Sequence, residues 1–315
     1  MNKSKILLTI LFSIAINTCF ADKYPRNYSV DMIHYAFELT LSDNTDEIIG
    51  RTTIDVLFKT NDQKQVRLDL ASKNEKRAGK GMVVESVTCN GQILEFVHEN
   101  DVLLIKLPQA AEKNKTYTFV VKYKGIPADG LRIGATRYGD RSFFNENWPN
   151  RTRHWLPTVD HPYDKATSEF IVTAPSHYKV VSNGLLLEES MLNNEQKLTH
   201  WKQSVPVSSW LFVLGVCDFA VQYVDQFEGK SIQTWVYSKD REAGFYDFAS
   251  PTKQVLEFYS AYVGPFAYEK MASIQTPSVN GGMETSSAIF YGQDLINGKR
   301  DVRLRNVVIH ELAHQ

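Results

Sequence analysis

From Asp31 to about residue 123, hydrophobic and polar residues alternate along the chain with a period of two. This period is typical of β-strands with one buried face, because successive side chains of a strand point to opposite sides of the sheet. We therefore expect a series of half-buried strands in this region. The alternating apolar positions are Tyr35, Phe37, Leu39 and Leu41; Ile54, Val56 and Phe58; Val66, Leu68 and Leu70; and Tyr117, Phe119, Val121 and Tyr123.

A second group of short strand patterns follows, and no helical pattern longer than two turns precedes residue 240. Tight turns are indicated by Asn90-Gly91, Asn183-Gly184 and Glu228-Gly229, because asparagine and glycine favour the left-handed backbone of such turns. Residues 22–217 are therefore predicted to form a mainly β domain built on a large antiparallel sheet. The second group of strands is expected at residues 169–174, 179–183, 198–202 and 210–219.

The pattern changes after residue 217, where signals for helices and strands alternate. Ser250 is expected to cap the start of a helix with Pro251 in the first helical position. The apolar stripe of this helix should end at Gly264-Pro265. We therefore predict that residues 218–315 begin an α+β domain. The stripe consists of Val255, Leu256, Tyr259, Tyr262 and Val263, and strands are expected at residues 271–275 and 287–291.

The composition excludes two classes of protein. With 43% hydrophobic and 12% aromatic residues, the chain is too apolar for an intrinsically disordered protein. Its net charge of −1 leaves no surplus of lysine and arginine to neutralise the phosphates of a nucleic acid. A length of 315 residues suits about two globular domains.

The N-terminal segment has the layout of a secretory signal peptide. Two lysines lie within residues 1–5, residues 6–16 carry no charge, and Cys19-Phe20-Ala21 precedes Asp22. We expect cleavage near Ala21 and export to the periplasm or the extracellular space. No stable membrane span is expected, because crossing a bilayer takes about 20 apolar residues. A retained signal anchor and a lipoprotein signal ending at Cys19 are alternatives, and the residues before Cys19 fit the second poorly.

Export would leave two cysteines, Cys89 and Cys217, so the mature chain can form one disulfide at most. Cys217 ends an apolar run, which favours a small buried thiol. The sequence leaves open whether the two cysteines pair.

A last helix is predicted from Asp301 onward, and it carries the sequence His310-Glu311-Leu312-Ala313-His314. Residues four apart lie one turn apart on the same helix face, so two imidazoles can converge on one metal ion. A neutral imidazole is a good zinc ligand. The glutamate between them can take a proton from a water that attacks a carbonyl group. The apolar face that would anchor this helix consists of Leu304, Val307, Val308 and Leu312.

A second candidate feature is Gly281-Gly282-Met283-Glu284-Thr285. Two glycines allow the backbone of a ligand to approach closely, and a carboxylate beside them can hold an ammonium group. A glycine-rich turn with a solvated glutamate is the simpler alternative. The proximity of this segment to the H-E-x-x-H sequence favours the binding role.

Together the two motifs resemble those of the aminopeptidase N family of zinc metallopeptidases. Gly281-Gly282-Met283-Glu284 is similar to that family's G-x-M-E-N sequence, and residues 310–314 are similar to its H-E-x-x-H sequence. The resemblance extends to residues 153–162, 165–167 and 181–184, and so covers nearly all of the chain after residue 21.

This resemblance implies a fold and a set of functional residues. The fold would be a saddle-like β domain at residues 22–217, followed by the first part of a thermolysin-like catalytic domain at residues 218–315. His310 and His314 would bind one zinc ion, and Glu311 would be the general base.

The resemblance also implies how a peptide with a free N-terminus would bind. Glu284 would hold the α-amino group, and Gly281, Gly282 and Met283 would lie along the substrate. In the family a further glutamine or glutamate of the β domain helps to hold the amine, and Glu146 is the candidate here.

Two departures from the family pattern affect the prediction. Thr285 occupies the position of the usual asparagine. The family's third zinc ligand, a glutamate on the next helix, and its oxyanion-stabilising tyrosine lie beyond Gln315. We therefore expect a fragment of a zinc aminopeptidase that lacks the third ligand, unless an upstream histidine or aspartate completes the site. The alternatives are a catalytically inactive β-rich binding protein and, less favoured because of Glu284, a zinc endopeptidase.

Overall fold

The computed structural model describes residues 22–249 and 251–315. The predicted signal peptide at residues 1–21 lies outside the described residues and stays a prediction. Ser250, the expected helix cap, also lies outside them.

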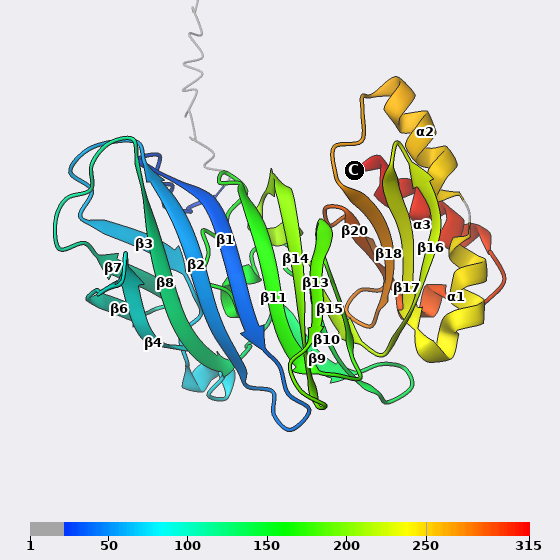
Figure 1. Cartoon of the computed structure of the whole chain (residues 1–315), viewed down its shortest axis with the longest axis horizontal. Coiled ribbons are helices and arrows are strands. Elements are labelled where there is room, and N and C mark those ends of the chain that lie inside the picture. The colour runs from blue at the N-terminus through cyan, green and yellow to red at the C-terminus, as the bar shows by residue number, and fades with distance from the viewer. Residues whose placement is uncertain (1–21, 250) are drawn as a thin grey trace, which may run out of the picture.

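An eight-stranded sheet forms the largest layer of the structure (Figure 1). Its strand order is β13-β14-β11-β1-β2-β8-β4-β5, and all neighbours are antiparallel except β1 and β11, which are parallel. The prediction of an antiparallel sheet is therefore wrong at this pair. Parallel neighbours require a long crossover, which the chain between β1 and β11 supplies. The strands are β1 Val30–Thr40, β2 Ile48–Phe58, β4 Gly81–Cys89, β5 Gln92–Ile93, β8 Lys115–Ile126, β11 Ala166–Pro175, β13 Leu185–Met191 and β14 Gln196–Val207.

Two smaller sheets complete the β-rich part of the chain. One has the order β12-β15-β10-β9 and the other has the order β3-β7-β6. Their strands are β3 Gln65–Asp69, β6 Phe96–Glu99, β7 Val102–Lys106, β9 Leu131–Ala135, β10 Arg141–Asn145, β12 Lys179–Ser182 and β15 Leu214–Cys217. Short 3₁₀ helices lie at Glu75–Arg77, Thr152–His154, Ser209–Leu211, Ser238–Asp240 and Gln293–Leu295.

The period-two pattern correctly predicted the core of this part. Every alternating position named from the sequence is buried except Tyr117, which is half-buried. The ring of Phe37 on β1 lies 5.0 Å from that of Phe170 on β11. It lies 5.6 Å from the ring of Phe212, two residues before β15. Each fully buried aromatic side chain contributes on the order of 2–3 kcal/mol. This aromatic cluster therefore joins the large sheet to the four-stranded sheet.

Cys89 and Cys217 are free, and both are buried. Burial raises the pKa of both thiols, that of Cys217 to about 12. Cys217 is 1% exposed within β15, as its apolar context predicted. The two thiols therefore pack as small hydrophobic groups.

Residues from Phe219 onward form a separate five-stranded sheet with the order β16-β17-β18-β20-β19. Figure 1 shows the three α-helices on one side of this sheet, at the right. A second apolar cluster, which includes Leu256, Leu304 and Val308, packs between them. The change of sheet falls at the predicted boundary, although the division into domains stays a prediction. The elements are β16 Phe219–Phe227, β17 Lys230–Tyr237, α1 Arg241–Phe248, α2 Thr252–Tyr262, β18 Lys270–Thr276, β19 Gly282–Met283, β20 Ala288–Gly292 and α3 Val302–Ala313.

Three local predictions need correction. Pro251 is the N-cap of α2 and does not occupy its first turn. Tyr262 and Val263 are 78% and 83% exposed, so only the inner part of the predicted stripe reaches the core. Asn183-Gly184 is a bend that links β12 of one sheet to β13 of another, rather than the predicted tight turn, and only Gly184 of the two has a positive φ.

Helix α1 was not predicted, because its sequence has hardly any apolar stripe. Its Gly244 packs directly on Val236, where a Cβ would lie 2.5 Å from a methyl group. Within the described part of the chain, no helix has the length and apolar character needed to cross a membrane.

Candidate metal centre

Helix α3 has one buried face and one exposed face. Its cap is Asp301, whose Oδ1 accepts a hydrogen bond of 2.9 Å from the amide of Leu304. This bond to a backbone N–H lowers the pKa of Asp301. The apolar side chains predicted to anchor the helix are buried, with Val307 partly so, whereas His310 and His314 are exposed.

The two histidine side chains converge as the spacing predicted. Their Nε2 atoms lie 3.4 Å apart. Two nitrogens that bind one tetrahedral zinc ion at about 2.0–2.1 Å lie roughly 3.3 Å from each other. With Glu311, the pair brings three possible ligand atoms within 4.8 Å. Imidazole nitrogens and a carboxylate are donors that zinc prefers, so these residues fit a zinc ion.

Glu311 is buried without the partners that a buried carboxylate normally has. It is 5% exposed, and its Oε2 has no hydrogen-bond partner among the described residues. Burial raises its pKa to about 7, the negative charge of Glu284 adds to the rise, and His310 opposes it. An unpartnered buried carboxylate is unfavourable for folding. A carboxyl group with a pKa near neutrality is, however, well suited to accept and return a proton.

The glycine segment lies directly against Glu311. A Cβ atom on Gly282 would lie 2.2 Å from Oε1 of Glu311, whereas a Cβ on Gly281 would meet nothing within 4 Å. A side chain at position 282 would therefore overlap Glu311, whereas Gly281 borders open space. Met283 is 8% exposed and packs in the main apolar core, so its side chain has a structural role.

Glu284 follows β19 and is partly exposed, close enough to raise the pKa of Glu311 by its charge. Thr285 is buried, and its hydroxyl donates to the carbonyl of Ala288. The threonine that departs from the family pattern therefore stabilises the turn after Glu284.

Glu146 lies just after β10 and is held by two arginines. Its carboxylate pairs with Arg151 and, at 3.3 Å, with Arg132. Burial raises the pKa of Glu146, and the two arginines oppose this rise. Arg132 also donates 2.8 Å to the carbonyl of Ser278, which leads into the glycine segment. No hydrogen bond or ion pair of the described residues joins Glu146 to Glu284 directly.

Gln315 is a contact residue that the sequence analysis missed. Its Oε1 accepts a 3.0 Å hydrogen bond from the amide of Ser287, and its Nε2 lies 3.4 Å from the carbonyls of Glu284 and Thr285. A polar residue after a helix carries no signal of such a role. Gln315 ties the end of α3 to the turn that carries Glu284.

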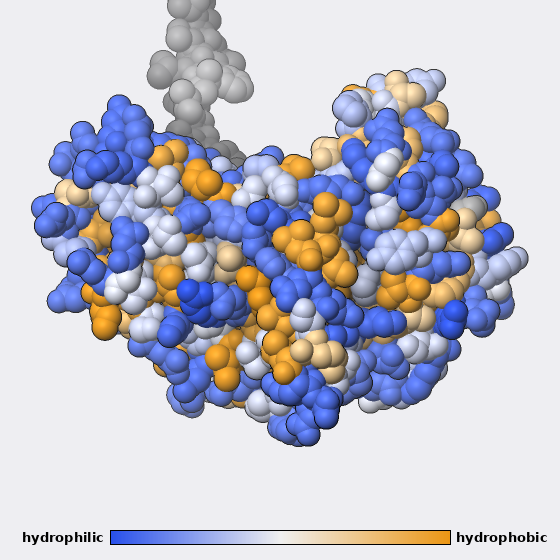
Figure 2. All heavy atoms as spheres, in the orientation of Figure 1, coloured by the Kyte–Doolittle hydropathy of each residue, from blue (hydrophilic) through white to orange (hydrophobic). Residues whose placement is uncertain are grey.

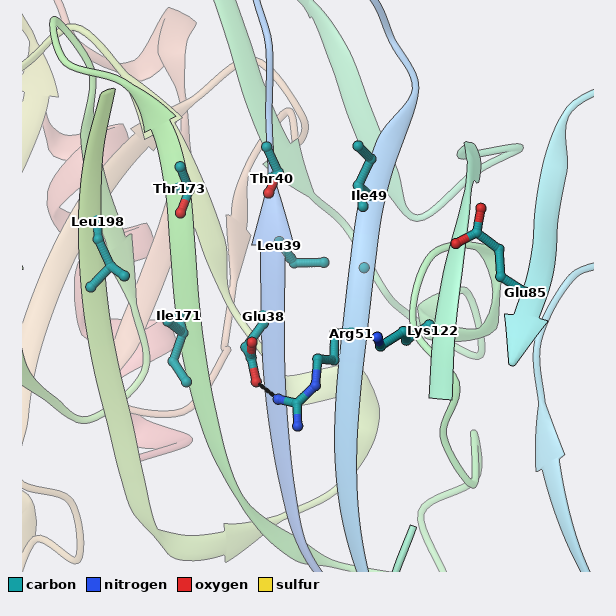
Figure 3. Close-up of a pocket in the computed structure, with 11 residues that line it drawn as sticks. Glu38, Leu39, Thr40, Ile49, Arg51, Glu85, Lys122, Ile171, Thr173 and Leu198 are labelled. Carbon is teal, nitrogen blue, oxygen red and sulfur yellow. Dashed lines mark hydrogen bonds and ion pairs between the residues drawn. The ribbon is translucent and has the colours of Figure 1, made fainter. Parts of the chain in front are cut away.

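A shallow hollow of about 310 Å³ lies elsewhere, on the outer face of the eight-stranded sheet. Figure 3 shows Glu38 and Arg51 paired there, with Ile49, Ile171 and Leu198 nearby. Figure 2 shows that apolar residues on the visible face form small patches among polar ones. The strands that line the hollow carry none of the candidate site residues, so we assign it no function.

Comparison with known families identifies the β-rich part of the chain. The family model described as the Peptidase M1 N-terminal domain matches residues 31–211.

Curated relatives are aminopeptidases and related proteins. Aminopeptidase A of Gloydius brevicauda is 24% identical over 92% of this chain and 32% of its own length. Tricorn protease-interacting factor F2 of Thermoplasma acidophilum is 25% identical over 92% of this chain and 35% of its own length. The chain thus spans about a third of the length of these relatives.

Solved structures share the fold. An M1 zinc metallopeptidase from Deinococcus radiodurans superposes with a TM-score of 0.75 and 24% identity, covering 91% of this chain and 64% of that one. A two-domain M1 zinc metallopeptidase variant bound to L-tryptophan gives a TM-score of 0.76 and 23% identity, covering 91% of this chain and 65% of that one.

Proposed function

This chain belongs to the M1 peptidase family, and we propose that it carries the zinc-binding helix and the amine-binding loop of a zinc-dependent aminopeptidase. Its substrates would be peptides with a free N-terminus. The proposal rests on one observation above all: two converging imidazoles flank the buried Glu311, whose Oε2 has no hydrogen-bond partner among the described residues and whose side chain lies against the glycine segment before Glu284.

The donor set suits a zinc ion held by Nε2 of His310 and Nε2 of His314. A catalytic zinc normally takes three protein ligands, and these two residues would be two of them. When bound, the ion would polarise the peptide carbonyl and make a water molecule more acidic.

Glu311 would move the proton. Burial raises its pKa, and a carboxylate beside the two imidazoles could accept a proton from a water molecule and return it to the departing amine. Its Oε2 has no hydrogen-bond partner among the described residues. None of their polar groups therefore competes with a water molecule for this oxygen.

Glu284 would select the substrate terminus. Glu284 is partly exposed and lies one residue beyond the short strand β19, and Gly281, three residues earlier, borders open space. A substrate ammonium placed there would form a charge-assisted hydrogen bond, which a blocked N-terminus cannot form. Glu146, with its two arginines, would support this region through the contact between Arg132 and Ser278.

Zinc content and hydrolysis of an aminoacyl arylamide test the proposal. In the complete enzyme, which would also carry the third ligand, we expect about one zinc per chain, lost in His310→Ala and in His314→Ala, because catalytic zinc depends on these ligands. His177→Ala is the matched control, since His177 is an exposed histidine that pairs with Asp43 at 3.6 Å, far from the candidate site in sequence. Zinc content far below one, with no hydrolysis, would contradict the proposal and favour the non-catalytic β-rich binding protein.

Export to the periplasm or the extracellular space is also part of the proposal. Cleavage before Asp22 would preserve the contacts of Asp22 with His161, at 3.1 Å, and with Arg26, at 2.8 Å. The N-terminal sequence of the natural protein tests this point. A protein that starts at Asp22 would support it, whereas one that keeps residues 1–21 would contradict it.

A further inference from the structure

The turn at residues 285–287 joins Glu284 to β20 and is wholly enclosed. Thr285, Ser286 and Ser287 are at most 2% exposed. Ser287 has a φ of 61°, a left-handed backbone conformation that residues other than glycine rarely adopt. Such a conformation persists only where the surrounding structure holds it in place.

The β-rich part of the chain supplies much of this support. The hydroxyl of Ser287 accepts a 2.8 Å hydrogen bond from the amide of Gly184 and lies 3.3 Å from Oε1 of Gln203, to which it donates. Nδ2 of Asn183 donates 2.6 Å to the carbonyl of Ser286. All of these groups are buried, so the bonds are not in competition with water.

The supporting segment is itself fixed. Oδ1 of Asn183 accepts 2.6 Å from the amide of Val213, and its Nδ2 also donates 3.0 Å to the carbonyl of Leu211. Gly184 has a φ of 71°, and a Cβ at this position would lie 1.8 Å from the carbonyl oxygen of Lys202. The Asn183-Gly184 pair therefore presents its amide to Ser287 from a rigid position.

The same turn is held from the other side by the metal-binding helix. The amide of Ser287 donates 3.0 Å to Oε1 of Gln315, the residue next to His314. Ser287 thus bonds to the β-rich part through its hydroxyl and to the end of α3 through its backbone.

We propose that Ser287 is a positioning residue that sets Glu284 relative to His310 and His314, so that the β-rich part of the chain determines how the free amine is held. The inference rests on the proposed role of Glu284. Removal of the Ser287 hydroxyl should release the turn and weaken the selection for an unblocked N-terminus.

The first test measures amide hydrogen exchange in the full chain. In Ser287→Ala, exchange over residues 282–286 should become at least about tenfold faster, because two buried hydrogen bonds are lost. Ser286→Ala is the matched control: it removes an equally buried hydroxyl from the same turn, but one that bonds to Tyr268. If Ser287→Ala does not fold, Ser287→Gly removes the same hydroxyl and suits the positive φ.

The second test compares binding of L-leucinamide and N-acetyl-L-leucinamide by calorimetry. The parent protein should prefer the free amine, and Ser287→Ala should lower this preference about tenfold while Ser286→Ala keeps it. Equal effects of the two variants on exchange and on the preference would overturn the inference, because the Ser287 hydroxyl would then only stabilise the fold. If the parent protein shows no preference for the free amine, the proposed role of Glu284 is wrong. The inference then fails as well, even if hydrogen exchange shows that Ser287 holds the turn.

Discussion

Two buried carboxylates, one in each part of the molecule, differ in their hydrogen-bond partners. Asp160 in the β-rich part is 1% exposed, and Glu311 on α3 is 5% exposed. Asp160 receives hydrogen bonds from the guanidinium and the amide of Arg153 and from the hydroxyl of Ser209. Glu311 has an oxygen with no partner among the described residues.

Burial raises the pKa of both carboxyl groups, but only that of Asp160 is opposed by a close guanidinium and several hydrogen bonds. Removing one partner of a buried ion pair is destabilising because it leaves an uncompensated charge, whereas a buried carboxylate without partners is itself unfavourable. The difference agrees with a structural role for Asp160 and with the proposed catalytic role of Glu311.

The largest expected effect is that of Glu311→Gln on activity. In the complete enzyme, loss of the proposed general base should lower the rate of aminoacyl arylamide hydrolysis by about 10²–10⁴-fold. The free energy of unfolding should stay unchanged or rise, because an unfavourable buried charge is removed. Activity assays and urea unfolding measure the two quantities. A rate within threefold of the parent would show that Glu311 is not the base.

The converse substitution, Asp160→Asn, should act on stability. It replaces the buried charged partner of Arg153, whose side chain is 20% exposed, by a neutral group, and breaking such an ion pair typically costs about 3–5 kcal/mol. Urea unfolding of Asp160→Asn beside Glu311→Gln compares two isosteric changes. If the two variants have equal free energies of unfolding, the two carboxylates do not differ in their contribution to stability.

Gly282→Ala tests the packing of the glycine segment on Glu311. The new methyl group would overlap the glutamate, and overpacking of this kind costs about 1–3 kcal/mol. Gly281→Ala is the matched control, since its methyl group would meet open space. Thermal unfolding of both variants should separate them, and equal melting temperatures would contradict the close contact.

The last expected effect is a pH dependence of stability caused by Lys270, a buried lysine between the two parts. It is fully buried, its Nζ donates 2.6 Å to the carbonyl of Ser182, and burial lowers its pKa to about 7. Between pH 7 and the ordinary lysine pKa near 10.4, the unfolded chain binds more protons, so stability should rise with pH.

The contribution of Lys270 should approach about 1.4 kcal/mol per pH unit within that window. Lys270→Met should be more stable than the parent at pH 7 and should lose this part of the rise between pH 7 and 9. Urea unfolding at the two pH values measures it. Identical pH dependence in both proteins would show that Lys270 is not the source.

Much of the fold could be predicted from local patterns. Alternation along Tyr35, Phe37 and Leu39 identified buried strand faces because the side-chain period of a strand is a property of its own backbone. The sequence could not indicate that β1 pairs in parallel with β11, because residues that distant in the chain come together only in the folded sheet. Helix α1 was missed because packing on Val236 accommodates it without an apolar stripe.

The candidate site divides in the same way. The sequence by itself determined that His310 and His314 converge, because residues four apart on one helix must lie on the same face. Only the tertiary structure decided that Glu311 is buried without a partner, that Gly282 lies against it, and that Ser287 links Glu284 to the β-rich part. These properties depend on segments far apart in the chain, and the burial and close contacts that produce them exist only after those segments have packed together.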